Sequence, residues 1–473
     1  MYKKVKLLRE LVIISSRNFY FYILLENEEV IEVRLDKKNK TNSVGSIFKG
    51  KVKKLLPHMN AAFIDIGEKK EAFLPLKDHL ECCQKLKVGD EPLLQLRRAS
   101  IQSKGAKLSC KITLPGKYLV LMPTIDYISV STKLDEETKK LLKKRIYEII
   151  QPFNEEDKFG YIIRTKAINA TDEEIIQDFQ ALKQQWNNIV KRYHKVNAPA
   201  LLYEEGLRAY AFLRDYAGDI QKIYTNDKYL AEQLEDYIRL NFNKSDIKVI
   251  YVSENKESLF EKYNVERLIN RILNPYVWLK TGGYLIIEET EALVAIDVNS
   301  GSLKKYKTLE ETALHTNLEA AKEIVKQIRL RDLGGIIVVD FIDMYLEEYK
   351  EKLIKVLEEE IKKDKQTIKI KSFTSLGLLE LTRKKADKSL IKQLSEVCQH
   401  CEGSGYNKGK DIVLFEIENK IKSLKPFFKL KIFINKALEK DIKSLIKDLS
   451  LENEVEIVIN KNLKQFEYRI EKF

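Results

Sequence analysis

The sequence predicts a multidomain fold that combines α/β parts with one small all-β part. The chain has 473 residues, and a single hydrophobic core rarely grows beyond about 250 to 300 residues. Apolar runs rich in Val and Ile alternate with segments of helical period over much of the chain. One early region, 42–110, instead contains short strand-like runs separated by turns. We therefore expect three or more structural units.

Region 42–110 is predicted to be an OB-type barrel. Strand composition and a turn at Gly67 mark three runs, namely Ile47–Leu55, Ala61–Ile66 and Ala72–Leu76. Aromatic and basic residues interleave there, namely Phe48, Phe63 and Phe73 with Lys49, Lys51, Lys53 and Lys54. Such barrels stack bases and follow phosphates with this mixture, although any single phenylalanine is expected more often in the core. A basic cluster downstream supports a nucleic-acid partner, namely Arg97, Arg98, Lys104 and Lys107.

The next regions are predicted to mix strands with helices. Between residues 111 and 208 we expect two strands and two helices, namely Tyr118–Met122, Tyr161–Arg164, Glu136–Ile150 and Asp172–Tyr193. Arg164 and Thr165 end the second strand, and a guanidinium beside a hydroxyl can hold a phosphate. A lone pair of this kind usually consists of ordinary surface residues. Region 209–263 alternates helices and strands without visible chemistry.

Two short apolar segments, Ala295–Asn299 and Ile337–Asp343, each end in carboxylates. Because side chains alternate faces along a strand, Asp297 and Asn299 are expected to point together. A long helix is predicted between the segments, with apolar residues at helical spacing, namely Leu314, Leu318, Ala321, Val325 and Ile328. Thr308 and Glu311 form a candidate capping box at its start, and Gly334-Gly335 follows the basic run Arg329-Leu330-Arg331 at its end.

A strand, a helix and a second strand usually place the two strands side by side and parallel. Their carboxyl ends then lie at one edge of the sheet, where α/β proteins bind their ligands. Asp297, Asn299 and Asp340 would meet there. Two carboxylates and an amide suit Mg²⁺ or Mn²⁺, whereas solvated turn residues are the alternative interpretation of either segment alone.

Cys398-Gln399-His400-Cys401 is followed by glycines at 403 and 405, a pattern typical of a zinc knuckle. Structural zinc takes four ligands, and the chain has no second Cys-x-x-Cys. We therefore predict a homodimer in which two copies share one zinc ion. A redox-active cysteine pair, and His400 as a further ligand within one chain, are the alternatives. The remaining tail predicts a compact α/β unit, with helices at 413–423 and 438–449 and strands at 429–435 and 455–460.

The composition favours a polyanionic partner and a reducing compartment. With 84 Lys+Arg against 71 Asp+Glu, the formal charge is +13 and the pI about 9.1, although a general lysine bias would also raise both. Five cysteines, two of them adjacent, do not form a secreted disulfide framework. Arg9 and Glu10 interrupt the first apolar run, so no signal peptide or membrane span is expected. We expect a cytoplasmic protein.

Several longer motifs carry a resemblance to a known family. They are Gly-Lys-Val, Asn-Ala-Ala-Phe-Ile-Asp-Ile-Gly and Ala-Phe-Leu-Pro-Leu in the barrel region, Lys117–Pro123, Ala295–Gly301, Thr316–Ala321, Arg329–Met344 and the Cys-x-x-Cys-x-Gly-x-Gly segment. Together they resemble the ribonuclease E/G family, from about Ser46 to Gly405. That family comprises bacterial and plastid endoribonucleases that select single strands.

The resemblance implies an OB-type RNA-binding barrel, an α/β catalytic core with RNase H-like and deoxyribonuclease-like parts, a zinc link and a small C-terminal α/β domain. The implied boundaries are 1–41 and 209–272 for the RNase H-like subdomain, 42–110 for the barrel, 111–208 for a 5′-end sensor region, 273–394 for the catalytic deoxyribonuclease-like subdomain, 395–408 for the zinc link and 409–473 for the C-terminal domain. The lack of a long tail resembles the short ribonuclease G type.

The resemblance also implies roles for individual residues. The implied Mg²⁺ site is Asp297, Asn299 and Asp340, with Mn²⁺ as a possible substitute. The implied 5′-monophosphate pocket is Gly116, Val120, Arg164 and Thr165, although Lys166–Thr171 differs from the usual sensor loop. The implied RNA contacts near the cut are Phe63, Phe73 and Lys104. The implied zinc link between protomers is Cys398 and Cys401, with a dimer of dimers as a further possibility.

The predicted function is Mg²⁺-dependent cleavage of single-stranded RNA in RNA processing and decay, acting on rRNA precursors and mRNA. The motifs contain no histidine pair or lysine that would act through the ribose 2′-hydroxyl, so we expect 5′-phosphate and 3′-hydroxyl ends. Two alternatives stay open at this point. One is a non-catalytic RNA-binding or ribosome-associated factor, and the other is a Mg²⁺-dependent deoxyribonuclease.

Overall fold

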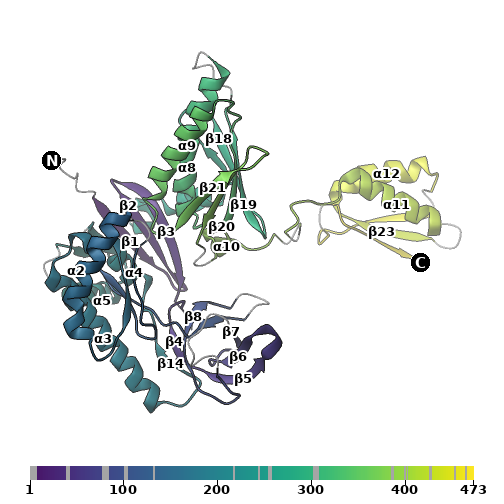
Figure 1. Ribbon diagram of the computed structural model, residues 1–473. Helices are drawn as coiled ribbons and strands as arrows, with labels where there is room; N and C mark the ends of the chain where they lie inside the picture. The colour runs from purple at the N-terminus through teal and green to yellow at the C-terminus, as the bar shows by residue number, and fades with distance from the viewer. Residues whose placement is uncertain are drawn as a thin grey trace. The chain divides into compact units, whose positions relative to one another are not determined.

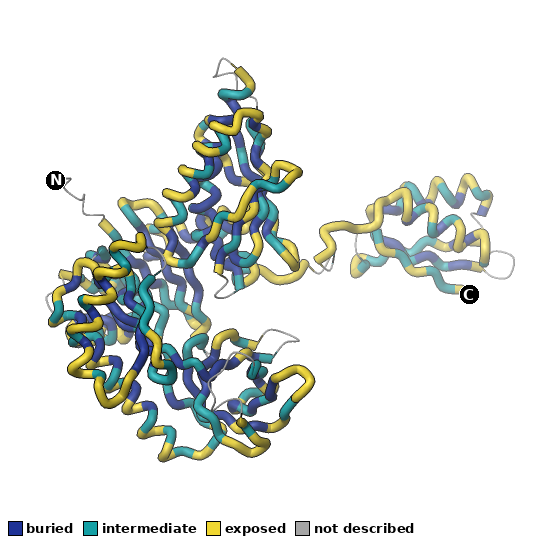
Figure 2. Tube along the Cα trace, in the orientation of Figure 1, coloured by how far each residue is buried: buried dark blue, intermediate teal, exposed yellow. Residues whose placement is uncertain are grey.

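The computed structural model describes residues 8–38, 43–76, 85–100, 105–131, 134–216, 219–242, 246–253, 258–301, 308–384, 388–398, 401, 403–424, 429–451, 454–463 and 466–472. The chain divides into two compact units, Met1–Leu394 and Ser395–Phe473 (Figure 1). The described residues form five sheets. Buried residues follow the strands of each sheet, and exposed residues lie on the outer helix surfaces and in loops (Figure 2).

The first sheet combines strands from the start of the chain with strands more than 180 residues later. Its order is β16-β15-β1-β2-β3. The strands are β1 (Arg9–Ser15), β2 (Phe19–Glu26), β3 (Glu29–Lys37), β15 (Ile220–Thr225) and β16 (Lys248–Tyr251). Alternation along β1 sends Leu11 and Ile13 toward α4 (Arg208–Tyr216) and α5 (Lys228–Asn241). Val12 packs on the other face with α6 (Leu259–Lys262) and α7 (Val265–Leu273). Both faces of the sheet are therefore covered.

The second sheet contains the predicted barrel. Its order is β14-β4-β8-β9-β7-β6-β5. The elements are β4 (Ile47–Lys49), β5 (Lys51–Leu56), η1 (Pro57–Met59), β6 (Ala61–Asp65), β7 (Ala72–Pro75), β8 (Leu93–Arg98), β9 (Lys107–Ser109) and β14 (Ala200–Tyr203). Gly50 alone separates β4 from β5, yet β5 lies at one edge and β4 near the other, so the sheet curls back on itself. Gly67 adopts a φ of +84° at the predicted turn. The OB-type assignment stays a prediction.

The third sheet has the order β10-β11-β13-β12. Its elements are β10 (Leu114–Pro115), β11 (Leu119–Met122), β12 (Ile128–Val130), α2 (Glu136–Asn154), β13 (Gly160–Ile163), η2 (Thr165–Asn169) and α3 (Asp172–Lys195). Thr171 and Glu174 form a capping box that starts α3. Both predicted helices are present, and each extends slightly beyond the predicted range.

The fourth sheet contains the two carboxylate-bearing segments. Its order is β17-β18-β19-β20-β22-β21. The elements are β17 (Tyr276–Trp278), β18 (Tyr284–Glu289), β19 (Leu293–Asn299), α8 (Leu309–Leu330), β20 (Gly335–Asp340), α9 (Glu347–Ile361), β21 (Ile368–Phe373), β22 (Leu379–Arg383) and α10 (Leu390–Leu394). β19 and β20 are parallel neighbours, and the Thr308 side chain caps α8. The predicted strand, helix and strand are therefore confirmed.

A buried ion network ties the first sheet to the fourth. Arg383 on β22 donates to Asp332 at 2.8 Å and to Asp364 at 2.9 Å. Arg34 on β3 lies 3.4 Å from the same Asp332 carboxylate. Burial would raise the pKa of Asp332, but the guanidinium groups of Arg34 and Arg383 hold that pKa below its usual value. The network fixes how β3 and β22 meet.

The C-terminal unit has its own sheet, of order β24-β23-β25, and its own core. Its elements are α11 (Lys410–Leu424), β23 (Leu430–Ile434), η3 (Lys436–Leu438), α12 (Glu439–Asp448), β24 (Val455–Ile459) and β25 (Tyr468–Lys472). The predicted helices and strands are present, while β25 was not predicted.

Two further sequence predictions can be compared with the structure. Among the described helices, none combines the length and the apolar composition needed to cross a bilayer. Cys401 is a free thiol, in line with the reduced cysteines expected from the sequence. Cys110 is buried and disulfide-bonded, which differs from that expectation.

Candidate functional site

The carboxyl ends of β19 and β20 bring two carboxylates side by side. Asp297 and Asp340 are direct partners in the parallel register. Both are exposed, whereas Ile296 and Val339 beside them are buried in the core. Asn299 donates from Nδ2 to Oδ2 of Asp297 at 2.8 Å, so the three predicted groups lie together. A pleated strand places Asp297 and Asn299 on one face.

The electrostatics of this edge favour a cation. Partial burial, and then the negative charges of Asp297 and Asp343, raise the pKa of the Asp340 carboxyl. A divalent ion between the carboxylates would relieve that repulsion. The part of the chain that the structure describes contains no cluster of three or more His, Cys, Asp or Glu ligands. The donor set is therefore two carboxylates and an amide, which fits Mg²⁺ because this ion keeps several waters and shares substrate phosphate oxygens.

Helix α8 fixes the loop that follows Asp340. Asn317 is fully buried, donates from Nδ2 to the Ile342 carbonyl at 2.8 Å and accepts from the Ile342 amide at 3.1 Å. Glu310 at the first turn accepts from the amides of Tyr345 and Leu346, at 2.9 and 3.3 Å. Sequence reasoning missed these supports and the proximity of Asp343. A polar residue in the apolar stripe of a helix, as at Asn317, was the available signal.

The second sheet presents a paired aromatic surface. Phe63 on β6 and Phe73 on β7 face each other in register, with ring centroids 6.1 Å apart, and both are half-buried. Lys107 pairs with Phe73 and is exposed, so a cation lies beside the rings. Lys104 lies outside the described residues.

Two residues assigned to that basic and aromatic face lie elsewhere. Phe48 is 1% exposed and belongs to the barrel core, because it faces inward on β4. Lys49 donates to the carbonyls of Tyr193 and Val196 at the end of α3 and pairs with Glu91. Its ammonium is therefore occupied by structural contacts. The predicted basic face is therefore wrong at Lys49, whereas Phe48 follows the core alternative.

The candidate phosphate-binding residues gather at one corner of the third sheet. Arg164 Nη1 donates to the Gly116 carbonyl at 2.7 Å, and Nη2 pairs with Asp215 of α4. Thr165 is exposed, and its hydroxyl lies 3.2 Å from that of Ser131. Val120 pairs with Pro115 on β10 and Ile162 on β13. The structure thus brings Gly116, Val120, Arg164 and Thr165 to one place.

Asp178 of α3 shapes the loop at Gly116. Its carboxylate accepts the backbone N–H groups of Lys117, Tyr118 and Leu119 at 2.8 to 2.9 Å. A Cβ at Gly116 would meet an Asp178 oxygen at 2.6 Å, so only glycine fits. Burial raises the pKa of the Asp178 carboxyl, and the three N–H donors act against that increase.

Cationic side chains converge on the end of α4. Lys166 Nζ donates to the Arg214 carbonyl and Lys365 Nζ to the Asp215 carbonyl, each at 3.0 Å. Burial first, and then the charges of Lys365 and Arg164, lower the pKa of Lys166 to about 7. Cations at a helix C-terminus interact favourably with its dipole. The candidate phosphate site therefore has positive charge behind Arg164.

The Cys398–Cys401 segment turns sharply after the second cysteine. Ser404 donates from its amide and its hydroxyl to the Cys401 carbonyl, at 2.9 and 2.7 Å. Gly403 and Gly405 have φ values of +87° and +77°, a backbone conformation that favours glycine. Cys398 is exposed and Cys401 is partly exposed. Two accessible thiols on a glycine turn fit half of a tetrahedral zinc site, while His400 lies outside the described residues.

Comparison with known proteins gives a consistent result. The family model described as "Ribonuclease E/G family" matches residues 113–386. The chain is 34% identical to "Ribonuclease G" of Haemophilus influenzae over 461 residues, which cover 93% of each chain. It is 33% identical to "Ribonuclease G" of Escherichia coli (strain K12), with 82% of each chain covered. It is 32% identical to "Ribonuclease E" of Nostoc sp., over 77% of this chain and 54% of that protein.

Proposed function

The chain belongs to the ribonuclease E/G family and is an enzyme of that type, and from this premise we propose that it cuts single-stranded RNA with the help of Mg²⁺. The single observation that carries the proposal is the in-register pair Asp297 and Asp340, at the edge of the sheet where ligands bind. Mn²⁺ would substitute for Mg²⁺ at such an oxygen site.

Asp297 and Asp340 would hold the ion, and Asn299 orients the Asp297 carboxylate through its Nδ2 hydrogen bond. When bound, Mg²⁺ would polarise the scissile phosphate and make a water molecule more acidic. The water oxygen bonds to phosphorus, the P–O3′ bond breaks, and the leaving O3′ takes a proton. The products are a 5′-phosphate and a 3′-hydroxyl. A 2′,3′-cyclic phosphate would contradict this route.

The barrel is proposed to bind the RNA around the cut. So is the corner of the third sheet formed by Gly116, Val120, Arg164 and Thr165, which we call the sensor corner. Phe63 and Phe73 offer ring faces on which bases stack, with Lys107 beside them and Lys104 as a further predicted contact. Paired bases do not expose their faces, so single strands are preferred. Gly116, Val120, Arg164 and Thr165 are proposed to hold a 5′-monophosphate. The protein would act in the cytoplasm on rRNA precursors and mRNA.

Substitution of the paired carboxylates tests the proposal. We expect Asp297→Asn and Asp340→Asn to lower the cleavage rate by at least about a hundredfold, because each weakens the metal site. Their affinity for the same RNA, measured by fluorescence anisotropy, should stay near that of the unaltered chain. Asp236→Asn, an exposed aspartate on α5, is the matched control and should cut normally.

The unaltered chain also separates the alternatives. Tight RNA binding without cleavage, at any Mg²⁺ concentration, would favour the RNA-binding or ribosome-associated factor. Faster cleavage of a DNA strand than of an RNA strand of the same sequence would favour a deoxyribonuclease. Comparing the cleavage of RNAs with 5′-monophosphate, 5′-triphosphate and 5′-hydroxyl ends tests whether the sensor corner recognises the 5′-monophosphate.

A further inference from the structure

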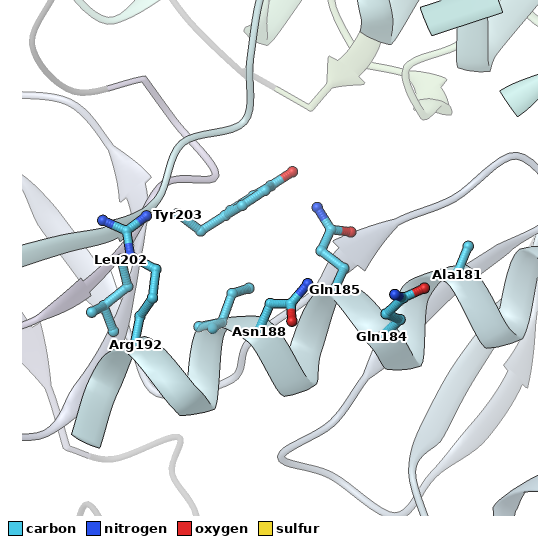
Figure 3. Close-up of a pocket in the computed structure, with 8 residues that line it drawn as sticks. Ala181, Gln184, Gln185, Asn188, Arg192, Leu202 and Tyr203 are labelled. Carbon is cyan, nitrogen blue, oxygen red and sulfur yellow. The ribbon is translucent and has the colours of Figure 1, made fainter. Parts of the chain in front are cut away.

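A pocket of about 400 Å³ lies between helix α3 and strand β14. Its floor contains the buried side chains of Ile189 and Leu202. In Figure 3 the Tyr203 ring stands over the helix, and the side chain of Gln185 extends toward it. No residue of this pocket belongs to the metal site, the barrel face or the sensor corner described above.

The lining has the chemistry of a nucleobase site. Tyr203 is half-buried and offers an aromatic ring, while Gln185 and Asn188 bring amides that donate and accept. Single-stranded RNA is recognised by stacking bases on aromatic rings and by hydrogen bonds to their edges. Arg192 Nη2 donates to the Leu201 carbonyl at 3.3 Å, which holds a cation at the rim of the pocket. The volume of the pocket lies within the range of about 300 to 1,000 Å³ that is typical of small-molecule sites.

The pocket shares a helix face with the sensor corner. Asp178, Ala181, Gln185, Asn188 and Arg192 follow one another at steps of three or four residues, which places them in one stripe along α3. Asp178 holds the loop at Gly116, where Arg164 also donates. Seven residues of helix separate Asp178 from Gln185, a rise of about 10 Å. The two sites are therefore separated by about 10 Å along a rigid element, the length of a few nucleotides at about 3.4 Å each.

We propose that this pocket binds one nucleobase of the RNA, a few nucleotides downstream of the 5′ end that occupies the sensor corner. The base stacks on Tyr203, the amides of Gln185 and Asn188 bond its edge, and Arg192 faces the backbone phosphates. The net charge of +13 favours the approach of the strand. The proposal rests on the proposed function and adds a base-contacting site to it.

An abasic scan tests the proposal. Binding is measured for the full chain carrying Asp297→Asn, which prevents cleavage, with a 5′-monophosphorylated single-stranded RNA. Further RNAs of the same sequence each carry a single abasic nucleotide, placed at the second, third, fourth, fifth or sixth position. We expect one position to lose about tenfold in affinity, the scale of one stacked base.

Added substitutions assign that position to the pocket. Gln185→Ala with Asn188→Ala should weaken binding of the intact RNA and reduce the abasic loss, because the base then keeps only its stacking on Tyr203. Asn187→Ala is the matched control, since Asn187 is exposed on α3, one residue from Asn188 and off the stripe. Tyr203→Leu is a second variant, whose folding is checked by its melting temperature because the ring is partly packed.

Three results would overturn the proposal. In the first, no abasic position alters affinity. In the second, an abasic loss persists unchanged in the doubly substituted chain. In the third, adenosine 5′-monophosphate alone binds the pocket as tightly as the RNA does, which would assign it to a free nucleotide. Cleavage of the intact RNA by the unaltered chain with Mg²⁺ is measured in parallel. If the chain cuts RNA but the abasic scan fails, only the pocket proposal is contradicted. If the chain shows no cleavage and no RNA binding, the proposed function is contradicted.

Discussion

At the scale of single residues, the environment of Lys166 shows how burial changes chemistry. Its ammonium is held by the Arg214 carbonyl, among the charges of Lys365 and Arg164. Sequence reasoning noticed only that this segment departs from the related sensor loops. The lowered pKa depends on α4 and on the segment before β21, which local sequence does not bring together. Such a residue links stability to pH.

The pKa of Lys166 predicts a pH dependence of stability. The folded chain loses the proton at about pH 7, whereas an ordinary lysine holds it to about 10.5. Between these values the unfolded chain binds more protons, so the free energy of unfolding rises with pH, by up to about 1.4 kcal/mol per pH unit. Urea unfolding at a series of pH values measures the slope.

Lys166→Met should flatten that slope and raise stability at neutral pH, because a charge is no longer buried. Lys191→Met, at an exposed lysine of α3, is the control and should leave the slope as it is. An equal slope in both variants would contradict the role assigned to Lys166.

At the scale of elements, helix α8 acts as the support of the carboxylate edge. Its spacing and cap were predicted from the sequence, since both are local properties of the chain. Its polar contacts with the loop after β20 were not, because hydrogen bonds between Asn317 and Ile342 require the parallel pairing of β19 with β20. The loop beside the candidate metal site is thus held by a residue that carries none of the candidate ligand oxygens.

Asn317→Ala should weaken the candidate site and the fold together. The lost hydrogen bonds leave the Ile342 amide and carbonyl unsatisfied, a cost of about 1–3 kcal/mol. Because the loop carries Asp343 and follows Asp340, the apparent Mg²⁺ affinity, measured as the Mg²⁺-induced rise in melting temperature, should fall as well.

Thr316→Val is the matched control on the same helix. Thr316 is buried, and its hydroxyl donates to the Thr312 carbonyl within α8. This variant should lose stability, yet keep the Mg²⁺-induced rise. The same loss of Mg²⁺ response in both variants would show that the effect is general destabilisation.

At the scale of the whole molecule, buried charge joins parts that are distant in sequence. Arg383, Asp332, Asp364 and Arg34 come from four separate stretches of the chain and exclude water from one another. The Arg383 and Asp364 side chains are 1% and 2% exposed. Removing one member therefore leaves other charges buried without partners.

Arg383→Met should destabilise the chain by about 3–5 kcal/mol, the cost of breaking a buried ion pair. Arg145→Met is the control, since the Arg145 and Asp172 side chains are 37% and 49% exposed and such a solvated pair is worth about 1 kcal/mol or less. Chemical denaturation of both variants measures the difference. A similar small loss in both would mean that the network contributes little.

The shared zinc ion is a prediction about assembly. We expect the purified protein to contain about one zinc per two chains and to have the mass of a dimer, or of a pair of dimers, in light scattering. Cys398→Ser and Cys401→Ser should each release zinc and lower the mass. A monomer that holds zinc would point to a ligand within one chain, and cysteines that cycle with a redox buffer would point to the redox alternative.

The sequence by itself determined the local elements and their chemistry. The carboxylates near the ends of β19 and β20, the cap and stripe of α8, and the glycine turn after Cys401 all follow from spacing and residue type over a few positions. These properties depend on neighbours along the chain, which the sequence displays directly. The same local logic placed both helices of region 111–208.

Only the tertiary structure decided which distant elements meet. It placed β14 beside β4, joined β1 to β15, put Phe48 in the core and paired Arg164 with Asp215. It also formed the pocket between Tyr203 and α3. Strand pairing and helix docking depend on the burial of surfaces from the whole chain, and local periodicity specifies that a face is apolar without specifying its partner.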